Sequence, residues 1–224
     1  MRPLLASPIL LASLAISSHA ATYSISTTDQ GWIDSTGNHG STNTNYIVGT
    51  NPTIFRNFFI FTLPSIAPNE EFVSATISIY NPSGGYTSGD PTEHYTLSSV
   101  DYTAISTFIF NMSGNISAFN DLGDGTIFGE KDMDSTNNNQ TINIALNPAF
   151  LNAANSALAG SGQIALGGKI TTLDTDPNNT EFVFGYSGGT AVSMTFTTAA
   201  VPEPSSAILV LIGMGGLLRR RRSS

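Results

Sequence analysis

The sequence predicts an all-β protein: a single β-sandwich of jelly-roll type with at most one or two short helices. Three observations predict it. Asn, Thr, Ser and Gly are abundant, whereas only 11% of the residues are charged. Apolar residues alternate with polar ones in short runs, and turn residues such as Gly84-Gly85 and Gly188-Gly189 separate these runs. No internal repeat is visible, which argues against solenoid and propeller folds.

Ten short segments have the composition of strands. In segment 73–79, Val73, Ala75, Ile77 and Ile79 alternate with hydroxyl residues, which predicts a strand with one buried and one wet face. Segment 54–62 is more continuously apolar, so we expect a central strand that is covered on both faces. The expected strands are 22–27, 46–49, 54–62, 72–80, 93–100, 125–128, 140–146, 163–171, 180–186 and 191–197.

One helix is predicted directly after Asn147. Asn147 is a favourable N-cap, Pro148 suits the first helical position, and apolar residues of segment 150–158 share one face before Gly160 ends the helix. Segment 103–120 fits a helix or a strand equally well. The glycines of segment 123–125 predict a tight turn.

The N-terminus has the pattern of a secretory signal peptide. A short positive start at Met1-Arg2 precedes an apolar stretch, and small residues then stand at the positions that a signal peptidase reads. We expect cleavage between Ala20 and Ala21. This divides the chain into a signal peptide (1–20), a β-sandwich domain (21–198) and a C-terminal tail (199–224).

The C-terminal tail has three parts in order. Pro202, Glu203 and Pro204 keep the chain extended, an apolar run follows, and a cluster of basic residues ends it. The apolar run predicts a transmembrane helix, although about 14 residues of helix reach only about 21 Å of a hydrocarbon core of about 30 Å. The basic residues, which we expect on the cytoplasmic side, are Arg219, Arg220, Arg221 and Arg222.

This order of parts resembles the PEP-CTERM sorting signal of proteins exported by Gram-negative bacteria. The resemblance implies that the Sec translocon exports the chain and that an exosortase-type transpeptidase then cuts it near Pro202-Glu203-Pro204. In the stretches 45–49, 56–63 and 73–80 the β-domain resembles β-sandwich modules of secreted bacterial surface proteins. In the stretches 80–86, 93–97 and 182–188 it is similar to a group of uncharacterised PEP-CTERM proteins. The implied location is transiently the inner membrane, and afterwards the cell surface or the extracellular polysaccharide of a biofilm.

Charge and cysteine content restrict the partners. Within residues 21–204, Arg56, Lys131 and Lys169 are the only Lys or Arg residues, against 16 Asp and Glu. An acidic body excludes nucleic acid as a natural partner and favours cations. The chain has no cysteine, so disulfides do not stabilise it. Its core must do so, and a bound metal could add to this stability.

Calcium is the candidate cofactor, and otherwise none is expected. Asp132 and Asp134, and again Asp174 and Asp176, place carboxylates at alternate positions of expected loops, which suits a hard cation that binds oxygen. Neither stretch has the spacing of an EF-hand. The alternative for these residues is ordinary turn chemistry, in which the side chains hydrogen-bond to nearby backbone.

Sugar binding and catalysis are weaker alternatives. Trp32 and Tyr86 are candidates for an aromatic platform that stacks on sugar rings, although such residues more often pack across strands. Paired carboxylates for a glycosidase could come from Glu70, Glu71, Glu93, Glu130 and Glu181. Ice binding is a further alternative, but no Thr-x-Thr ladder of fixed period runs along the sequence.

The sequence therefore predicts an exported protein of the cell envelope or extracellular matrix that is not an enzyme. A carbohydrate-binding module of the extracellular polysaccharide is the alternative function. A glycoside-acting enzyme or an ice-binding protein is less favoured.

Overall fold

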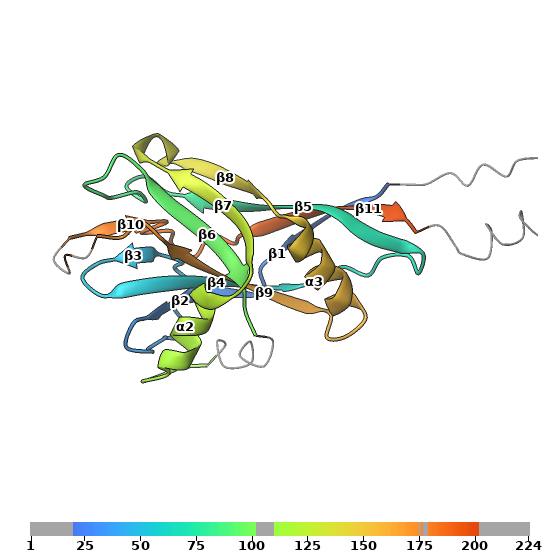
Figure 1. Ribbon diagram of the computed structural model, residues 1–224, viewed down its shortest axis with the longest axis horizontal. Coiled ribbons are helices and arrows are strands. Elements are labelled where there is room, and N and C mark those ends of the chain that lie inside the picture. The colour runs from blue at the N-terminus through green and yellow to red at the C-terminus, as the bar shows by residue number, and fades with distance from the viewer. Residues whose placement is uncertain (1–19, 102–109, 175, 177–178, 202–224) are drawn as a thin grey trace, which may run out of the picture.

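A computed structural model describes residues 20–101, 110–174, 176 and 179–201 (Figure 1). The described part of the chain is mostly strand, with two α-helices and one short 3-10 helix. The helices are α2 (Ile116–Asp124), α3 (Pro148–Leu158) and η1 (Ser135–Asn137). The strands are β1 (Thr22–Ser26), β2 (Asp29–Asp34), β3 (Val48–Thr50), β4 (Ile54–Thr62), β5 (Glu70–Asn81), β6 (Glu93–Ser99), β7 (Ile127–Met133), β8 (Gln140–Ala145), β9 (Gln163–Ile170), β10 (Glu181–Val183) and β11 (Ser193–Ala200). The all-β class is confirmed.

The strands form two antiparallel sheets. The smaller sheet has the order β1-β11-β5-β8, and the larger sheet has the order β10-β3-β4-β9-β6-β7. Strand β2 pairs with β4 on the edge opposite β9. The inner faces of the two sheets meet in one large hydrophobic core, to which α3 contributes Phe150 and Ala154.

Strand β4 is covered on both faces, as its continuous apolar sequence predicted. Phe59 and Phe61 point into the core between the sheets. Phe58 and Ile60 point the other way, into a second cluster that they form with Leu122 and other residues of α2. All four side chains are at most 2% exposed.

Strand β5 alternates as expected only in its second half. Ala75, Ile77 and Ile79 are buried, but Val73 is 44% exposed and Phe72 is buried in its place. The pairing with β11 shifts at this point, because Thr197 and Thr198 pair with Ser74 and Phe72 and leave Val73 without a partner in register. This β-bulge reverses the direction of the side chains, so the prediction that Val73 is buried was wrong.

The second correction concerns α2, which includes Gly123, a residue predicted to lie in a tight turn. Arg56 on β4 fixes this end of the helix. Its guanidinium lies 4.3 Å from the centre of the Phe119 ring and donates hydrogen bonds to the carbonyl oxygens of Phe119 and Asn120 at 3.0 and 2.9 Å. A Cβ at Gly123 would stand 2.7 Å from this guanidinium, so a larger residue here would displace the Arg56 side chain.

Other strand boundaries also differ from the expected ones. Strand β7 extends to Met133, five residues beyond the expected end. Strand β10 ends at Val183 because Phe184 and Tyr186 have φ angles of 57°, outside the strand region. Strand β2 was not predicted at all.

Both ends of the described chain lie at one pole of the sandwich. Strand β1 begins where β11 ends, because Thr22 pairs with Thr197, and both reach the right side of Figure 1. The Val201 amide donates to the carbonyl oxygen of Asn69 at 2.7 Å. No helix in the described part of the chain has the length and apolar character to span a membrane.

Candidate functional site

The pole opposite the chain ends contains two buried carboxylates. Glu93 opens β6 and Glu181 opens β10, and their side chains are 0% and 2% exposed. Burying an ionised carboxylate is unfavourable unless hydrogen bonds, a cationic side chain or a metal compensates it. No Lys, Arg or His of the described residues forms an ion pair with either one.

The two carboxylates differ in their hydrogen bonds. Glu93 accepts from two hydroxyl groups, those of Ser88 at 2.6 Å and of Thr172. Glu181 accepts from the backbone amide of Asp174 at 2.9 Å. Counted over the residues that the structure describes, Glu181 therefore has fewer donors than Glu93 at similar burial.

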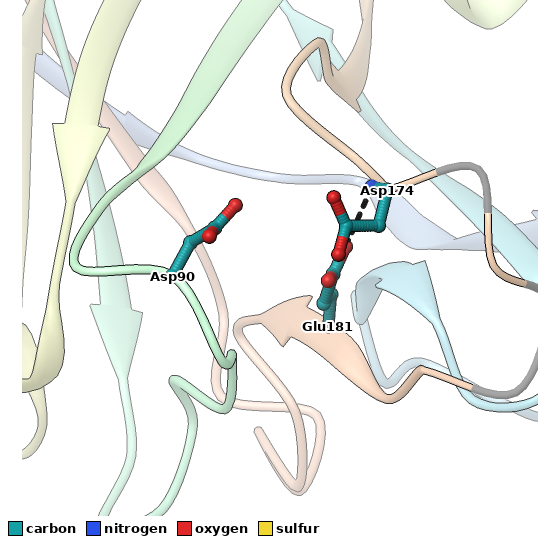
Figure 2. Close-up of side chains that lie close together, drawn as sticks. All are labelled: Asp90, Asp174 and Glu181. Atoms are coloured by element: carbon teal, nitrogen blue, oxygen red, sulfur yellow. Dashed lines mark hydrogen bonds between the residues drawn. The ribbon is translucent and has the colours of Figure 1, made fainter.

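Two further carboxylates lie next to Glu181. Asp90 comes from the loop between β5 and β6, and Asp174 comes from the loop between β9 and β10. Figure 2 shows the carboxylates of Asp90 and Asp174 facing one another, with Glu181 beside Asp174. One oxygen of each of the three residues lies within 4.8 Å of the other two. We call Asp90, Asp174 and Glu181 the acidic cluster.

Local hydrogen bonds hold Asp90 and Asp174 in place. The Asp90 amide donates to the Ser88 hydroxyl at 2.9 Å, and the Tyr86 hydroxyl donates to the Asp90 carbonyl oxygen at 2.9 Å. The Asn179 side chain donates to the Asp174 carboxylate at 2.8 Å. The side chains are thus positioned by their own loops, which are tied at the base by Glu93.

The electrostatics of the cluster favour a positive ligand. Burial raises the pKa of Glu181 above its ordinary value of 4.5, and the charges of Asp174 and Glu93 raise it further against the lowering effect of the Asp174 amide. A cation bound between the carboxylates reverses this effect, because it stabilises their ionised forms.

The oxygens of the acidic cluster lie close enough together to share one cation. Ligands on one Ca²⁺ lie about 2.3–2.6 Å from the ion and so up to about 5 Å from one another. The separations within the cluster, all 4.8 Å or less, are compatible with this geometry. Three carboxylates provide part of the six to eight oxygens that Ca²⁺ takes, and backbone carbonyls or water complete such shells.

Of the two predicted calcium stretches, one contributes to this cluster. Asp174 is a member of it. Asp176 is exposed in the same loop, two residues further on, and its carbonyl oxygen accepts from the Asn179 amide at 3.1 Å.

The other stretch forms separate local contacts. Asp132 lies within β7 rather than in a loop, and its carboxylate is 2.7 Å from Nδ1 of His94 on the neighbouring strand. Asp134 caps η1 and accepts from the amide and hydroxyl of Thr136 at 2.7 and 2.5 Å. These hydrogen bonds lower the pKa of Asp134. Asp134 thus has the turn chemistry that was the alternative to calcium binding.

The two aromatic residues predicted to stack on sugars, Trp32 and Tyr86, contact other protein groups rather than the carboxylates of the acidic cluster. Trp32 on β2 is half-buried, and its ring packs edge-to-face on Phe55 with 4.8 Å between centroids. Tyr86 is only 8% exposed and anchors the Asp90 loop through its hydroxyl. The ring of Tyr86 is therefore part of the packed interior and presents no open face.

The sorting residues Pro202, Glu203, Pro204 and Arg219 to Arg222 lie outside the described residues. At the predicted signal cleavage site, Ala20 is exposed, and Ala21 is joined to β11. The Ala21 amide donates to the Thr198 hydroxyl at 3.2 Å, and the Ala21 carbonyl oxygen accepts from the Thr198 amide at 2.9 Å.

Sequence reasoning missed Asp90 and the grouping of Glu181 with Asp90 and Asp174. Asp90 and Asp174 belong to loops that are far apart in the chain, and no spacing rule connects them. The available signal was the position of Glu93 and Glu181 at the first residues of apolar strands, where a carboxylate becomes buried. Comparisons of the chain with models of known protein families and with curated proteins find no match.

Proposed function

We propose that the chain is an exported, non-enzymatic protein of the cell envelope that an exosortase-type system sorts through its C-terminal tail. The observation that carries the proposal is the position of the chain ends. Ala21, the expected first residue of the mature protein, and Val201, the last residue before Pro202, both leave the same pole of the sandwich. A body held at one pole by a membrane-inserted tail presents its opposite pole to the exterior.

The proposed sorting sequence follows from the tail. The Sec translocon exports the chain, the apolar run stops transfer in the inner membrane, and Arg219 to Arg222 hold the terminus on the cytoplasmic side. Pro202, Glu203 and Pro204 then present an extended backbone to the transpeptidase. The processed body remains at the cell surface or in the extracellular polysaccharide.

We assign the body to the jelly-roll type. The support is the way the chain alternates between sheets: β4, β6, β7 and β9 belong to the larger sheet, and β5, β8 and β11 to the smaller one. The first and last strands, β1 and β11, are neighbours in the smaller sheet. Such exchange between two packed sheets is typical of double Greek-key sandwiches.

We propose further that the acidic cluster binds calcium and thereby fixes the exterior pole. Glu181 supports this proposal, because it is buried, has a raised pKa and accepts a hydrogen bond from one backbone amide. A divalent cation there would join the β5–β6 loop to the β9–β10 loop.

The sorting proposal is tested by intact mass and cell fractionation of the full chain, expressed in a host with an exosortase and in a host without one. We expect loss of the mass beyond about residue 204, with release or surface attachment, in the competent host alone. A variant with Ala at positions 202–204 keeps the apolar run and the arginines and should stay uncut. An uncut protein in the inner membrane of both hosts would mean that the tail is a plain anchor.

The calcium proposal is tested by thermal unfolding of the full chain with increasing Ca²⁺. A ligand that binds only the folded state stabilises it by about 2.7 kcal/mol at 100 times its Kd. We expect this stabilisation in the wild type and in Glu71→Gln, an exposed control, and its loss in Glu181→Gln. Equal stabilisation of all three proteins would place the bound ion elsewhere, and no stabilisation of the wild type would exclude calcium.

A further inference from the structure

The outward face of the smaller sheet carries a regular array of hydroxyl groups. Strands β1, β11 and β5 pair in register, and all nine outward positions in their paired central part are Ser or Thr. We call these nine residues the hydroxyl array. Its three rows, each running across the three strands, are Thr22–Thr197–Ser74, Ser24–Thr195–Thr76 and Ser26–Ser193–Ser78.

The array is open to solvent and neutral. Its β1 residues are exposed and its β11 residues are half-exposed, while the intervening side chains of both strands point into or toward the core. The three rows contain only hydroxyl residues, and beyond them on β5, past the bulge at Val73, stands the exposed Glu71, which pairs with Ala199. Within the described chain, Ser78 is the array member whose hydroxyl donates to another protein group, the Asn143 side chain at 2.7 Å.

The face lacks the features of a binding groove. Two hollows of the described chain, of about 510 and 400 Å³, border α3 and include no member of the array. Among the residues with a described position, the aromatic ring at the margin is that of Tyr80, whose hydroxyl already donates to Asn139 at 2.8 Å. A ligand of this face must therefore engage many weak hydrogen-bonding groups on an open surface.

The geometry of a sheet makes these groups periodic in two directions. Neighbouring strands are about 4.8 Å apart, and alternate residues of one strand are about 6.8 Å apart. Each hydroxyl both donates and accepts a hydrogen bond. Such an array is complementary to a neutral partner whose oxygen atoms also repeat in two dimensions at a few ångströms.

We propose that the hydroxyl array binds the surface of ice crystals. Ice is a neutral lattice of water molecules, each of which donates and accepts hydrogen bonds. Water molecules that are ordered on the hydroxyl array can therefore join this lattice. Absence of charge favours this ligand, because ionised side chains organise water around themselves. Crystalline polysaccharide is the neighbouring possibility, but binding to flat sugar faces relies on exposed aromatic rings, and the three rows contain none.

Because of sheet twist, we expect residues at the centre of the array to contribute more to ice binding than residues at its edges. Neighbouring strands rotate by about 20–25°, so rows lose alignment with a flat lattice away from the centre. Thr195 occupies the middle of the middle strand, between Ser24 and Thr76. A change at Thr195 should therefore have the largest effect on ice binding.

The test is the incorporation of the purified full chain, in detergent, into slowly growing ice, with a soluble reporter protein in the same micelles as the blank. We expect enrichment in the ice fraction relative to the blank, and expect Thr195→Lys to fall to the blank level. Thr195→Val, which keeps the shape and removes the hydroxyl, should reduce the enrichment less. Thr62→Lys, at an exposed threonine that ends β4 in the other sheet, is the matched control and should retain full enrichment.

Three results would overturn the proposal. The wild type could be excluded from ice like the blank, or Thr62→Lys could lose as much enrichment as Thr195→Lys. The third is binding to insoluble glucan fibres that Thr195→Lys abolishes, without ice binding, which would assign the face to polysaccharide. Circular dichroism of each variant shows that its fold is intact. The outcome is independent of tail processing and of calcium.

Discussion

The two sheets of this protein differ in whether their outer faces are packed or exposed. The larger sheet is covered again by α2, so that Phe58 and Ile60 of β4 are as buried as Phe59 and Phe61. The smaller sheet leaves its outer face to water, and β5 alternates buried Ile77 with partly exposed hydroxyl residues. The difference shows that the period of apolar residues reports how many faces of a strand are packed.

The largest expected effect tests whether the cluster under α2 is a true second core. We expect Phe58→Ala to lower the free energy of unfolding by about 3–5 kcal/mol, because it leaves a cavity beside Leu122. Urea unfolding measures this loss. Phe110→Ala removes the same atoms from a side chain that is 63% exposed, and should change stability by less than about 0.5 kcal/mol. Similar small losses at both positions would mean that α2 does not seal this face.

The second prediction concerns how closely α2 approaches the larger sheet. A Cβ at Gly167 on β9 would stand 2.5 Å from the Cα of Leu122, a backbone atom that cannot move alone. We expect Gly167→Ala to cost about 1–3 kcal/mol through this overpacking. Thermal unfolding beside Gly40→Ala, where a Cβ meets nothing within 4 Å, provides the comparison. A neutral Gly167→Ala would contradict the close packing.

The third prediction uses pH to examine the acidic end of the larger sheet. In the folded state the pKa of Glu181 is raised above 4.5, first by burial and then by the neighbouring carboxylates. At pH values between 4.5 and this raised pKa, the folded protein therefore binds more protons than the unfolded protein. Without divalent cations, the stability of the wild type relative to Glu181→Gln should therefore fall as pH rises through this window. Asp29 and Asp121, whose pKa values burial also raises, are present in both proteins and cancel in the difference.

Urea unfolding at a series of pH values, with a chelator present, measures this difference. Calcium should remove the fall, because it stabilises the ionised carboxylates. A difference that rises with pH, or stays flat, would contradict the raised pKa of Glu181.

The smallest expected effect is on the open face of the smaller sheet. Thr76→Val keeps the shape of the side chain and removes a hydroxyl that makes no hydrogen bond to another described protein group. We expect a change in the free energy of unfolding within about 0.5 kcal/mol. A loss above 1 kcal/mol in urea unfolding would show that something covers this face.

Local signals predicted much of the fold. Strand β4 has the expected bounds, and α3 begins as expected, with the Asn147 side chain accepting from the Phe150 amide at 3.1 Å. Both follow from residues within one segment. Strand β2 was missed because its buried Gln30 is satisfied by distant groups, donating to the carbonyl oxygens of Thr44 and Thr190.

The candidate site was predictable only in part, for the same reason. The sequence showed Asp174 as an acidic loop residue. Its neighbour Asp90 comes from the β5–β6 loop, whereas Asp174 belongs to the β9–β10 loop, so the two are far apart in the chain. The hydroxyl array likewise combines short Ser and Thr alternations from the start, middle and end of the chain. Register, which is set by the whole fold, brings these separate segments together.

The hydrogen bonds between Ala21 and Thr198 have a consequence for the topology of the chain. They bring the beginning and the end of the body to neighbouring positions on one edge of the smaller sheet. A short linker from Val201 to Ala21 would close the body into a ring, and the ring could be reopened in an exposed loop. We therefore expect the fold to tolerate circular permutation, in which the order of the strands along the chain changes while their order in the sheets is kept.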